Sequence, residues 1–157
     1  MNPLKRILLV EDSPRDAELI LDALGTNQLA NEVVHVRDGA DALDYLYRRG
    51  EFADRADDHP ALMLLDLMLP KVDGLEVLRR IKGDAALKTI PVVMMTSSRQ
   101  EQDLIVSYQL GVNAYVVKPL KFQDFVEAVK QVGVFWAVLN EVPTTAGAPV
   151  PSVRDKR

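Results

Sequence analysis

The stretch RILLVEDSPRDAELILDAL, residues 6–24, carries a complete signal for a strand followed by a helix. Its apolar run at residues 7–10 has the length of a β-strand and leads into an acidic pair. Ser13 and Pro14 are then typical of a helix N-cap and the first helical position. Farther along, apolar residues recur at spacings of three and four, which places them on one face of a helix. The stretch therefore predicts a β-strand joined directly to an amphipathic helix.

The same alternation continues through the first 117 residues. Four more apolar runs of strand length follow, at residues 33–36, 62–65, 92–95 and 115–117. Segments with a helical period lie between these runs, and Asp38-Gly39 marks the turn from the second strand into the second helix. Strands that are apolar on both faces and alternate with amphipathic helices are typical of a parallel sheet covered on both sides. We expect one α/β domain.

The composition excludes several classes of protein function. The chain has 157 residues, of which 48% are apolar, and it contains no cysteine, which excludes a disulfide scaffold and thiol catalysis. A net charge of −4 does not favour a nucleic-acid partner. No apolar run approaches the roughly 18 residues of a membrane span. We expect a soluble, cytoplasmic protein that binds neither nucleic acid nor membrane.

Two regions depart from the regular alternation. Residues 48–60, RRGEFADRADDHP, lengthen one connection and are either a solvated surface loop or a partner-recognition segment. Near the C-terminus, a helical pattern that begins at Phe122 continues into VFWAVL at 134–139. Residues 143–157 have the composition of a disordered tail. The expected domain is therefore residues 1–142, with an extended C-terminal helix or arm.

Polar residues occur where the predicted strands end. Glu11 and Asp12 follow the first strand, Asp66 the third, Thr96 the fourth and Lys118 the fifth. Each residue alone has an ordinary explanation as a helix cap, a strand end or a turn. Because the carboxyl ends of parallel strands meet at one edge of the sheet, we expect three carboxylates, a hydroxyl and an ammonium in one crevice.

Such a crevice requires a cation. Two carboxylates about 5 Å apart repel each other by roughly 3 kcal/mol at an effective dielectric near 20. Oxygen ligands in octahedral geometry suit Mg²⁺. Asp66, on the central strand, is the candidate nucleophile toward phosphorus, and Lys118 would neutralise the remaining phosphate charge. The expected product is an acyl phosphate.

Four motifs carry a family resemblance: LLVEDS at 8–13, LLDLMLPKVDG at 64–74, MMTSS at 94–98 and AYVVKP at 114–119. Over about residues 5–133 the sequence resembles the receiver domain of bacterial two-component response regulators. The resemblance implies a doubly wound, flavodoxin-like α/β domain. Its five-stranded parallel sheet has the order 2-1-3-4-5 and is accompanied by five helices.

The resemblance also implies the phosphoacceptor and its metal site. Asp66 would take a phosphoryl group from the phosphohistidine of a sensor histidine kinase. Mg²⁺, with Ca²⁺ or Mn²⁺ as substitutes, would be held by Asp12 directly, by Glu11 through water, by Asp66 and by the backbone carbonyl of Met68. Pro70 and Gly74 match the turn after the phosphoacceptor.

The remaining positions match the residues that respond to phosphate in the family. Thr96 would bond a phosphate oxygen, Ser97 would stay small to admit phosphate, and Lys118 would pair with it, with a cis bond to Pro119. Tyr115 matches an aromatic switch that follows Thr96 inward; otherwise it is a half-buried edge residue.

Two positions depart from the family pattern. Met68 stands where many receivers carry Asn or another polar residue, and Ser98 replaces a frequent acidic or amide side chain. Because the metal ligand at 68 is main chain, coordination is unaffected. A group that orients water is lost, so we expect slow hydrolysis of the acyl phosphate.

No DNA-binding pattern follows the receiver motifs, so we expect signalling through protein contacts. Phe135 and Trp136 are candidate anchors of a homodimer built on the face of helix four, strand five and helix five; the alternative is a helix packed on its own sheet. The insert at 48–60, PVVMMTSS and the Phe-Trp ending resemble the small regulators paired with phytochrome-type kinases. That likeness implies a bacteriophytochrome as the kinase.

Other functional classes fit less well. An aspartyl-phosphate phosphatase needs a second Asp at position 68, where this chain has Met. A flavin binder would be repelled by the acidic EDSPRD loop at 11–16. The sequence thus predicts a signalling protein rather than an enzyme, and the remaining alternative is an unphosphorylated pseudo-receiver that acts only as a protein-binding module.

Overall fold

The protein forms a five-stranded parallel sheet flanked by helices. The computed structural model describes residues 4–26, 30–55, 59–97, 100–118, 121, 123–124, 144–145 and 148–149. The strands of the main sheet are β1 (Leu4–Val10), β2 (Ala30–Val36), β3 (Leu62–Asp66), β4 (Val92–Thr96) and β5 (Ala114–Val117). The helices are α1 (Pro14–Thr26), α2 (Gly39–Tyr47), the 3-10 turn η1 (Gly50–Phe52), α3 (Gly74–Lys82) and α4 (Glu101–Gln109).

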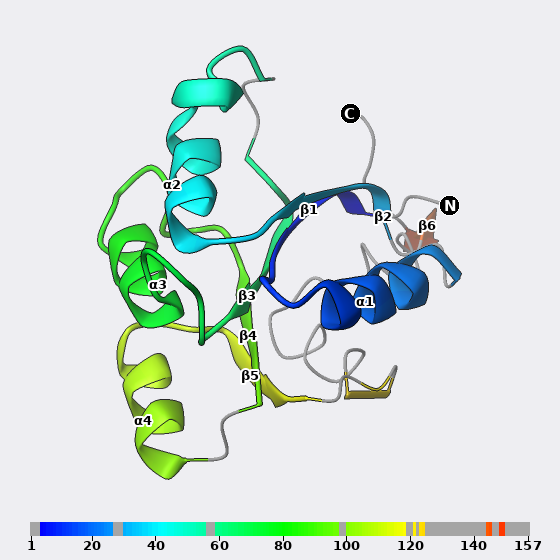
Figure 1. Ribbon diagram of the computed structural model, residues 1–157. Coiled ribbons are helices and arrows are strands. Elements are labelled where there is room, and N and C mark those ends of the chain that lie inside the picture. The colour runs from blue at the N-terminus through cyan, green and yellow to red at the C-terminus, as the bar shows by residue number, and fades with distance from the viewer. Residues whose placement is uncertain are drawn as a thin grey trace.

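The strands lie in the order β2-β1-β3-β4-β5, and every neighbouring pair is parallel. This is the predicted doubly wound topology. Figure 1 shows α1 on one face of the sheet and α2, α3 and α4 on the other. Because the chain crosses from one face to the other around β1, the strand ends at the centre of the sheet are open for a site.

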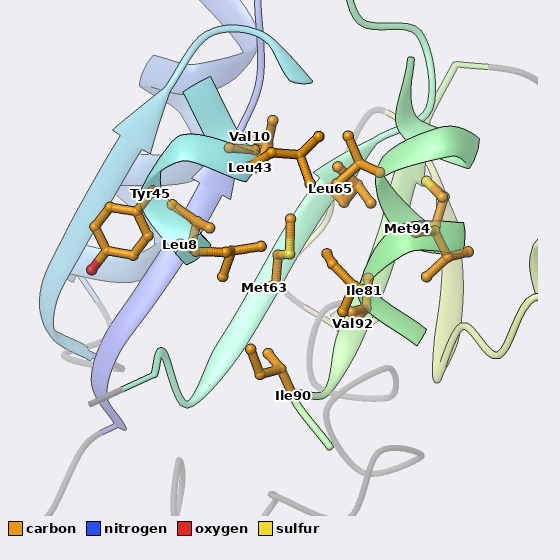
Figure 2. Packing of buried hydrophobic residues seen from close by; sticks show 14 of the residues in the cluster. Leu8, Val10, Leu43, Tyr45, Met63, Leu65, Ile81, Ile90, Val92 and Met94 are labelled. Carbon is orange, nitrogen blue, oxygen red and sulfur yellow. The ribbon is translucent and has the colours of Figure 1, made fainter. Parts of the chain in front are cut away.

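The core is divided between the two faces by the alternation of side chains along each strand. Leu8 and Val10 of β1 belong to the cluster under α2 and α3, together with Met63 and Leu65 of β3 (Figure 2). The intervening residues of the same strands point to the opposite face, where they pack with the apolar side of α1. Burial on both faces explains why β3 and β4 appear in the sequence as apolar runs up to Asp66 and Thr96.

The helix starts follow the predicted capping signals. The Ser13 hydroxyl accepts a hydrogen bond from the Asp16 N–H at 3.2 Å, directly before Pro14. Asp38 caps α2 by accepting from the Asp41 N–H at 2.8 Å. These caps satisfy N–H groups that have no partner within their helices.

The described part of the insert, residues 48–55, packs against the end of α2. The Arg55 side chain donates to the carbonyl oxygens of Tyr45 at 2.6 Å and Leu46 at 3.3 Å. Its guanidinium lies over the Tyr45 ring, which also makes an edge contact with Phe52. These contacts cap the last carbonyls of α2, while partner recognition by the insert stays a hypothesis.

Four α-helices are present among the described residues, one fewer than predicted. The fifth was expected after Lys118, and nearly all of that segment lies outside the described residues, as do Pro119, Phe135 and Trp136. Within the expected tail, β6 (Thr144–Thr145) and β7 (Ala148–Pro149) pair antiparallel; disorder of the tail stays a prediction. Among the described residues, no helix combines the length and the apolar character needed to span a bilayer.

Candidate functional site

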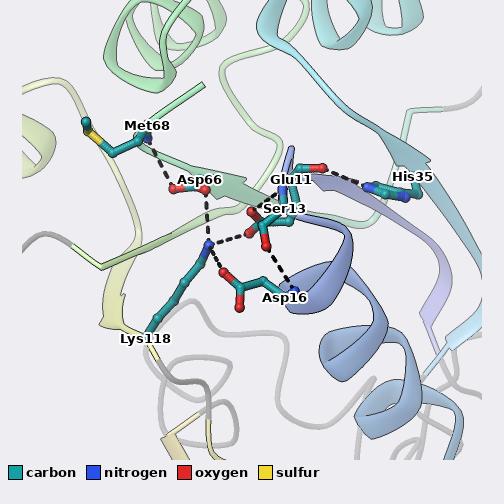
Figure 3. A network of polar contacts seen from close by, with 7 residues as sticks. All are labelled: Glu11, Ser13, Asp16, His35, Asp66, Met68 and Lys118. Carbon is teal, nitrogen blue, oxygen red and sulfur yellow. Dashed lines mark hydrogen bonds and ion pairs between the residues drawn. The ribbon is translucent and has the colours of Figure 1, made fainter. Parts of the chain in front are cut away.

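Four neighbouring strands deliver the site residues to one edge of the sheet. Glu11 and Asp12 directly follow β1, Asp66 and Thr96 are the last residues of β3 and β4, and Lys118 directly follows β5. The register places Asp66 beside Met95 and Thr96 beside Val117, so these ends are level. Figure 3 shows the side chains of Glu11, Asp66 and Lys118 converging in front of the sheet. The structure thus brings the side chains of Glu11, Asp66 and Lys118 together, with Thr96 at the end of the neighbouring strand.

Three carboxylates form the core of the site. Oxygen atoms of Glu11, Asp12 and Asp66 lie within 4.8 Å of one another. Glu11 is completely buried, Asp66 is 4% exposed, and Asp12 is exposed. Two buried carboxylates beside a third at the surface make a pocket with strong demand for positive charge.

Lys118 supplies part of that charge. Its Nζ lies 2.6 Å from Glu11 Oε1, 2.9 Å from Asp16 Oδ2 and 3.1 Å from Asp66 Oδ2 (Figure 3). The first contact is an ion pair outside hydrogen-bond geometry, which leaves the buried Glu11 Oε1 atom without a hydrogen-bond donor. The other two are hydrogen bonds. One ammonium therefore serves three carboxylates.

Burial and charge shift the acid–base properties of this pair. Burial raises the pKa of Glu11 to about 7, against the lowering effect of Lys118, and the Asp66 charge adds to the increase. Burial alone would lower the pKa of Lys118, but its contacts with Glu11 and Asp16 and the charge of Asp66 raise it overall. Lys118 thus remains a cation, whereas the anionic form of Glu11 is destabilised until more positive charge arrives.

The second oxygen of Asp66 is fixed by the chain that follows it. Asp66 Oδ1 accepts a hydrogen bond from the Met68 N–H at 3.1 Å. The Met68 side chain is 61% exposed and points away from the Asp66 carboxylate (Figure 3). The loop is closed by a hydrogen bond from the Gly74 N–H to the Leu67 carbonyl at 2.9 Å. Asp66 is therefore held with one oxygen on the main chain and the other facing Lys118.

Thr96 and Tyr115 lie on adjacent strands near this edge. Thr96 is completely buried, and its carbonyl accepts from the Lys118 N–H at 2.8 Å. Tyr115 pairs with Met94 and is partly buried against the cluster under α3. These positions bear on the expected switch, but the movement itself stays a prediction.

Two residues of the site were not predicted from the sequence. The Asp16 carboxylate, in the first turn of α1, accepts a hydrogen bond from Lys118. Its position three residues after the capping Ser13, in a first helical turn where an acidic side chain is favoured, is the signal that could have identified it. The His35 ring donates from Nε2 to the Glu11 carbonyl at 2.8 Å. No pattern in the sequence indicated that contact, because it joins residues 24 positions apart.

The donor set fits a divalent cation. Carboxylate oxygens of Glu11, Asp12 and Asp66 are hard ligands, and the Glu11 Oε1 atom lacks a hydrogen-bond donor. Hard oxygen donors with excess negative charge favour Mg²⁺ or Mn²⁺. The acidic cluster could therefore bind such an ion, and the buried members would benefit most from its charge.

Comparisons with known proteins agree with this geometry. The profile of the response regulator receiver domain matches residues 7–130. The response regulator Rcp1 of Synechocystis sp. is 44% identical over 142 residues, which cover 90% of this chain and 95% of Rcp1.

Solved structures of response regulators are also similar to this chain. The bacteriophytochrome response regulator AtBRR is 62% identical and superposes with a TM-score of 0.80 over 88% of this chain and 99% of that one. The phosphorylated cyanobacterial phytochrome response regulator RcpA is 44% identical, with a TM-score of 0.72 over 95% of this chain and 99% of its own. The Mn²⁺-bound form of Rcp1 is 41% identical, with a TM-score of 0.72 over 94% of this chain and 99% of its own.

Proposed function

Because the chain belongs to the response regulator receiver domain family and is related to the phytochrome response regulators, we propose that Asp66 accepts a phosphoryl group from the phosphohistidine of a sensor histidine kinase. The observation that carries this proposal is the position of Asp66. It is a buried carboxylate with Oδ2 3.1 Å from Lys118, beside two further carboxylates at the ends of the central strands. The relative RcpA, solved in its phosphorylated form, supports the proposal.

The chemistry is an exchange of one phosphorus bond for another. An Asp66 oxygen attacks phosphorus, the bond from phosphorus to the histidine nitrogen breaks, and that nitrogen keeps the electron pair. Glu11, Asp12, Asp66 and the Met68 carbonyl would hold Mg²⁺, which when bound neutralises charge on the phosphoryl oxygens. Lys118 would pair with a phosphate oxygen, and Thr96 would donate its hydroxyl to another.

The output is a change of surface rather than a second reaction. Tyr115 would follow Thr96 inward and remodel the face formed by α4, β5 and the segment after it. The relatives AtBRR and RcpA are phytochrome response regulators, which supports a phytochrome-type kinase as the partner that supplies the phosphoryl group. The competing function is a protein-binding module that is never phosphorylated.

Direct phosphorylation separates these two functions. The purified protein is incubated with a small acyl-phosphate donor and Mg²⁺, and the intact mass is measured. We expect the wild type to gain one phosphoryl group, Asp66→Asn to gain none, and the control Asp22→Asn, at an exposed position on α1, to behave as the wild type. An unmodified wild type would support the binding module instead, and a modified Asp66→Asn would show that another residue carries the phosphoryl group.

The side chain at position 68 should set the lifetime of the acyl phosphate. Met68 is exposed beside Asp66 and carries no group that could orient an attacking water. We expect slow hydrolysis in the wild type and faster loss of phosphate in Met68→Asn, by a factor on the order of ten, because a positioned polar group assists proton transfer. Phosphate release after removal of the donor measures both rates. Equal rates in the two proteins would contradict this prediction.

A further inference from the structure

Lys118 shares its ammonium among carboxylates with two different roles. Glu11 and Asp66 belong to the cluster that could hold a divalent cation. Asp16 does not belong to that cluster, yet its Oδ2 lies 2.9 Å from Nζ, closer than Asp66 at 3.1 Å (Figure 3). Among the residues that the structure describes, Asp16 is therefore the carboxylate partner of Lys118 that is not also a candidate metal ligand.

The ammonium and a divalent cation depend on the same two carboxylates. Nζ lies 2.6 Å from Glu11 Oε1 and 3.1 Å from Asp66 Oδ2, two atoms on carboxylates of the acidic cluster. A cation that enters the cluster repels the ammonium and weakens its hold on both groups. The Lys118 side chain is only 12% exposed, so water cannot readily replace lost partners. The energetic cost of binding a cation therefore depends on whether another carboxylate can keep an ion pair with the Lys118 ammonium.

Asp16 is held where its carboxylate can keep that ion pair with Lys118. Its N–H donates to Ser13 Oγ at 3.2 Å, and the Ser13 N–H donates to Glu11 Oε2 at 3.1 Å. These bonds tie the first turn of α1 to the acidic cluster, so Asp16 stays beside Lys118 at the rim of the pocket. Its side chain is 35% exposed, which makes its negative charge less costly than that of buried Glu11.

We propose that Asp16 is a positioning residue that retains Lys118 when a divalent cation occupies the acidic cluster, and that it thereby strengthens cation binding. The inference rests on the proposed function and assigns Asp16 a role within the same site. Asp16 acts through Lys118, and it contributes only weakly through its own long-range attraction to the cation.

A double-mutant cycle tests this coupling. Mn²⁺ is titrated calorimetrically into the wild type, Asp16→Asn, Lys118→Met and the double variant at the same pH and salt concentration. With Lys118 present, Asp16→Asn should weaken Mn²⁺ binding by about tenfold, within the range of coupling seen for residues in direct contact. In the Lys118→Met background, the same substitution should weaken binding by less than about twofold.

The cycle distinguishes coupling from simple attraction. If Asp16 acted only by its charge, its replacement would weaken Mn²⁺ binding equally in both backgrounds, and that result would overturn the proposal. Thermal unfolding in a chelator establishes that each variant is folded; Lys118→Gln replaces Lys118→Met in the cycle if the latter is unfolded. A wild type that neither binds Mn²⁺ nor gains a phosphoryl group would overturn the proposed function instead, so the two failures differ.

Discussion

The buried Glu11 carboxyl makes stability depend on pH in a direction opposite to that of an ordinary surface acid. Its pKa is raised from 4.5 to about 7, chiefly by burial. Between these values the folded protein binds a proton that the unfolded chain releases, so the contribution of Glu11 to stability falls as pH rises. This contribution is fully present below the unfolded value and is lost above about 7. A pKa shift of this size changes the free energy of unfolding by at most about 3 kcal/mol.

The variant Glu11→Gln reveals this effect. In a chelator, the free energy of unfolding of the wild type should decline relative to Glu11→Gln between about pH 5 and about pH 8, because only the wild type must bury a new charge. Denaturant titrations at several pH values measure the difference. With excess Mn²⁺ the wild type should gain stability as pH rises, since the ion binds the carboxylate. A difference that is flat with pH in the chelator would show that Glu11 titrates normally.

The residues of the site differ in how far the sequence could identify them. Asp66, Lys118 and Thr96 were predictable because each stands at the end of an apolar run, and parallel strands align their ends. Asp16 and His35 were not, because their contacts depend on how α1 and β2 are placed around β1. The pattern of apolar residues along the sequence indicates where strands end. It does not indicate how far apart the side chains of separate helices and strands lie.

Among the elements, α2 is packed unusually closely against the loop that follows Asp66. The Gly39 N–H faces the Pro70 carbonyl at 3.4 Å, and Asp38 pairs with Lys71 at the same distance. Lys71 adopts a left-handed φ of 68°. A Cβ atom on Gly39 would lie 2.7 Å from the Val72 carbonyl carbon and closer still to its oxygen. Only glycine allows this approach.

Gly39→Ala should therefore displace the loop that carries Met68. Because backbone atoms must move, we expect a loss of about 1–3 kcal/mol in stability, typical of overpacking, together with weaker Mn²⁺ binding. Thermal unfolding and calorimetric titration measure the two effects. The matched control is Gly25→Ala, because a Cβ there meets nothing within 4 Å. Normal Mn²⁺ affinity in Gly39→Ala would show that the loop position does not depend on this contact.

The elements themselves were the most predictable level. Each predicted apolar run lies within one of the five strands, and β3 and β4 are uninterrupted because they are buried on both faces. β1 and β2 begin earlier than their runs, and the added residues include polar positions outside the apolar pattern. The connection after α2 was less predictable. Its described part is organised by Arg55 bonding to the Tyr45 carbonyl and stacking on the Tyr45 ring, contacts that a charged composition does not reveal. Turn and loop geometry depends on such tertiary partners.

At the scale of the whole molecule, exposed apolar side chains lie on α4, next to β5. Leu104, Ile105 and Tyr108 are 37%, 46% and 47% exposed, and their spacing places them in an apolar strip on the exposed side of α4. The predicted dimer anchors Phe135 and Trp136 follow in the sequence and lie outside the described residues. Exposed apolar surface of this kind is typical of an interface.

We predict a homodimer that uses this strip and the two aromatic residues. Sedimentation should give a dimer at micromolar concentration, and the fluorescence of Trp136 should change on dilution. Loss of an aromatic anchor typically costs about 2 kcal/mol or more, so Phe135→Ser should weaken dimerisation by at least about thirtyfold. Leu19→Ser is the matched control, because Leu19 is 54% exposed on α1, on the opposite face of the sheet. A monomer with fluorescence independent of concentration would instead favour an aromatic segment packed on its own sheet.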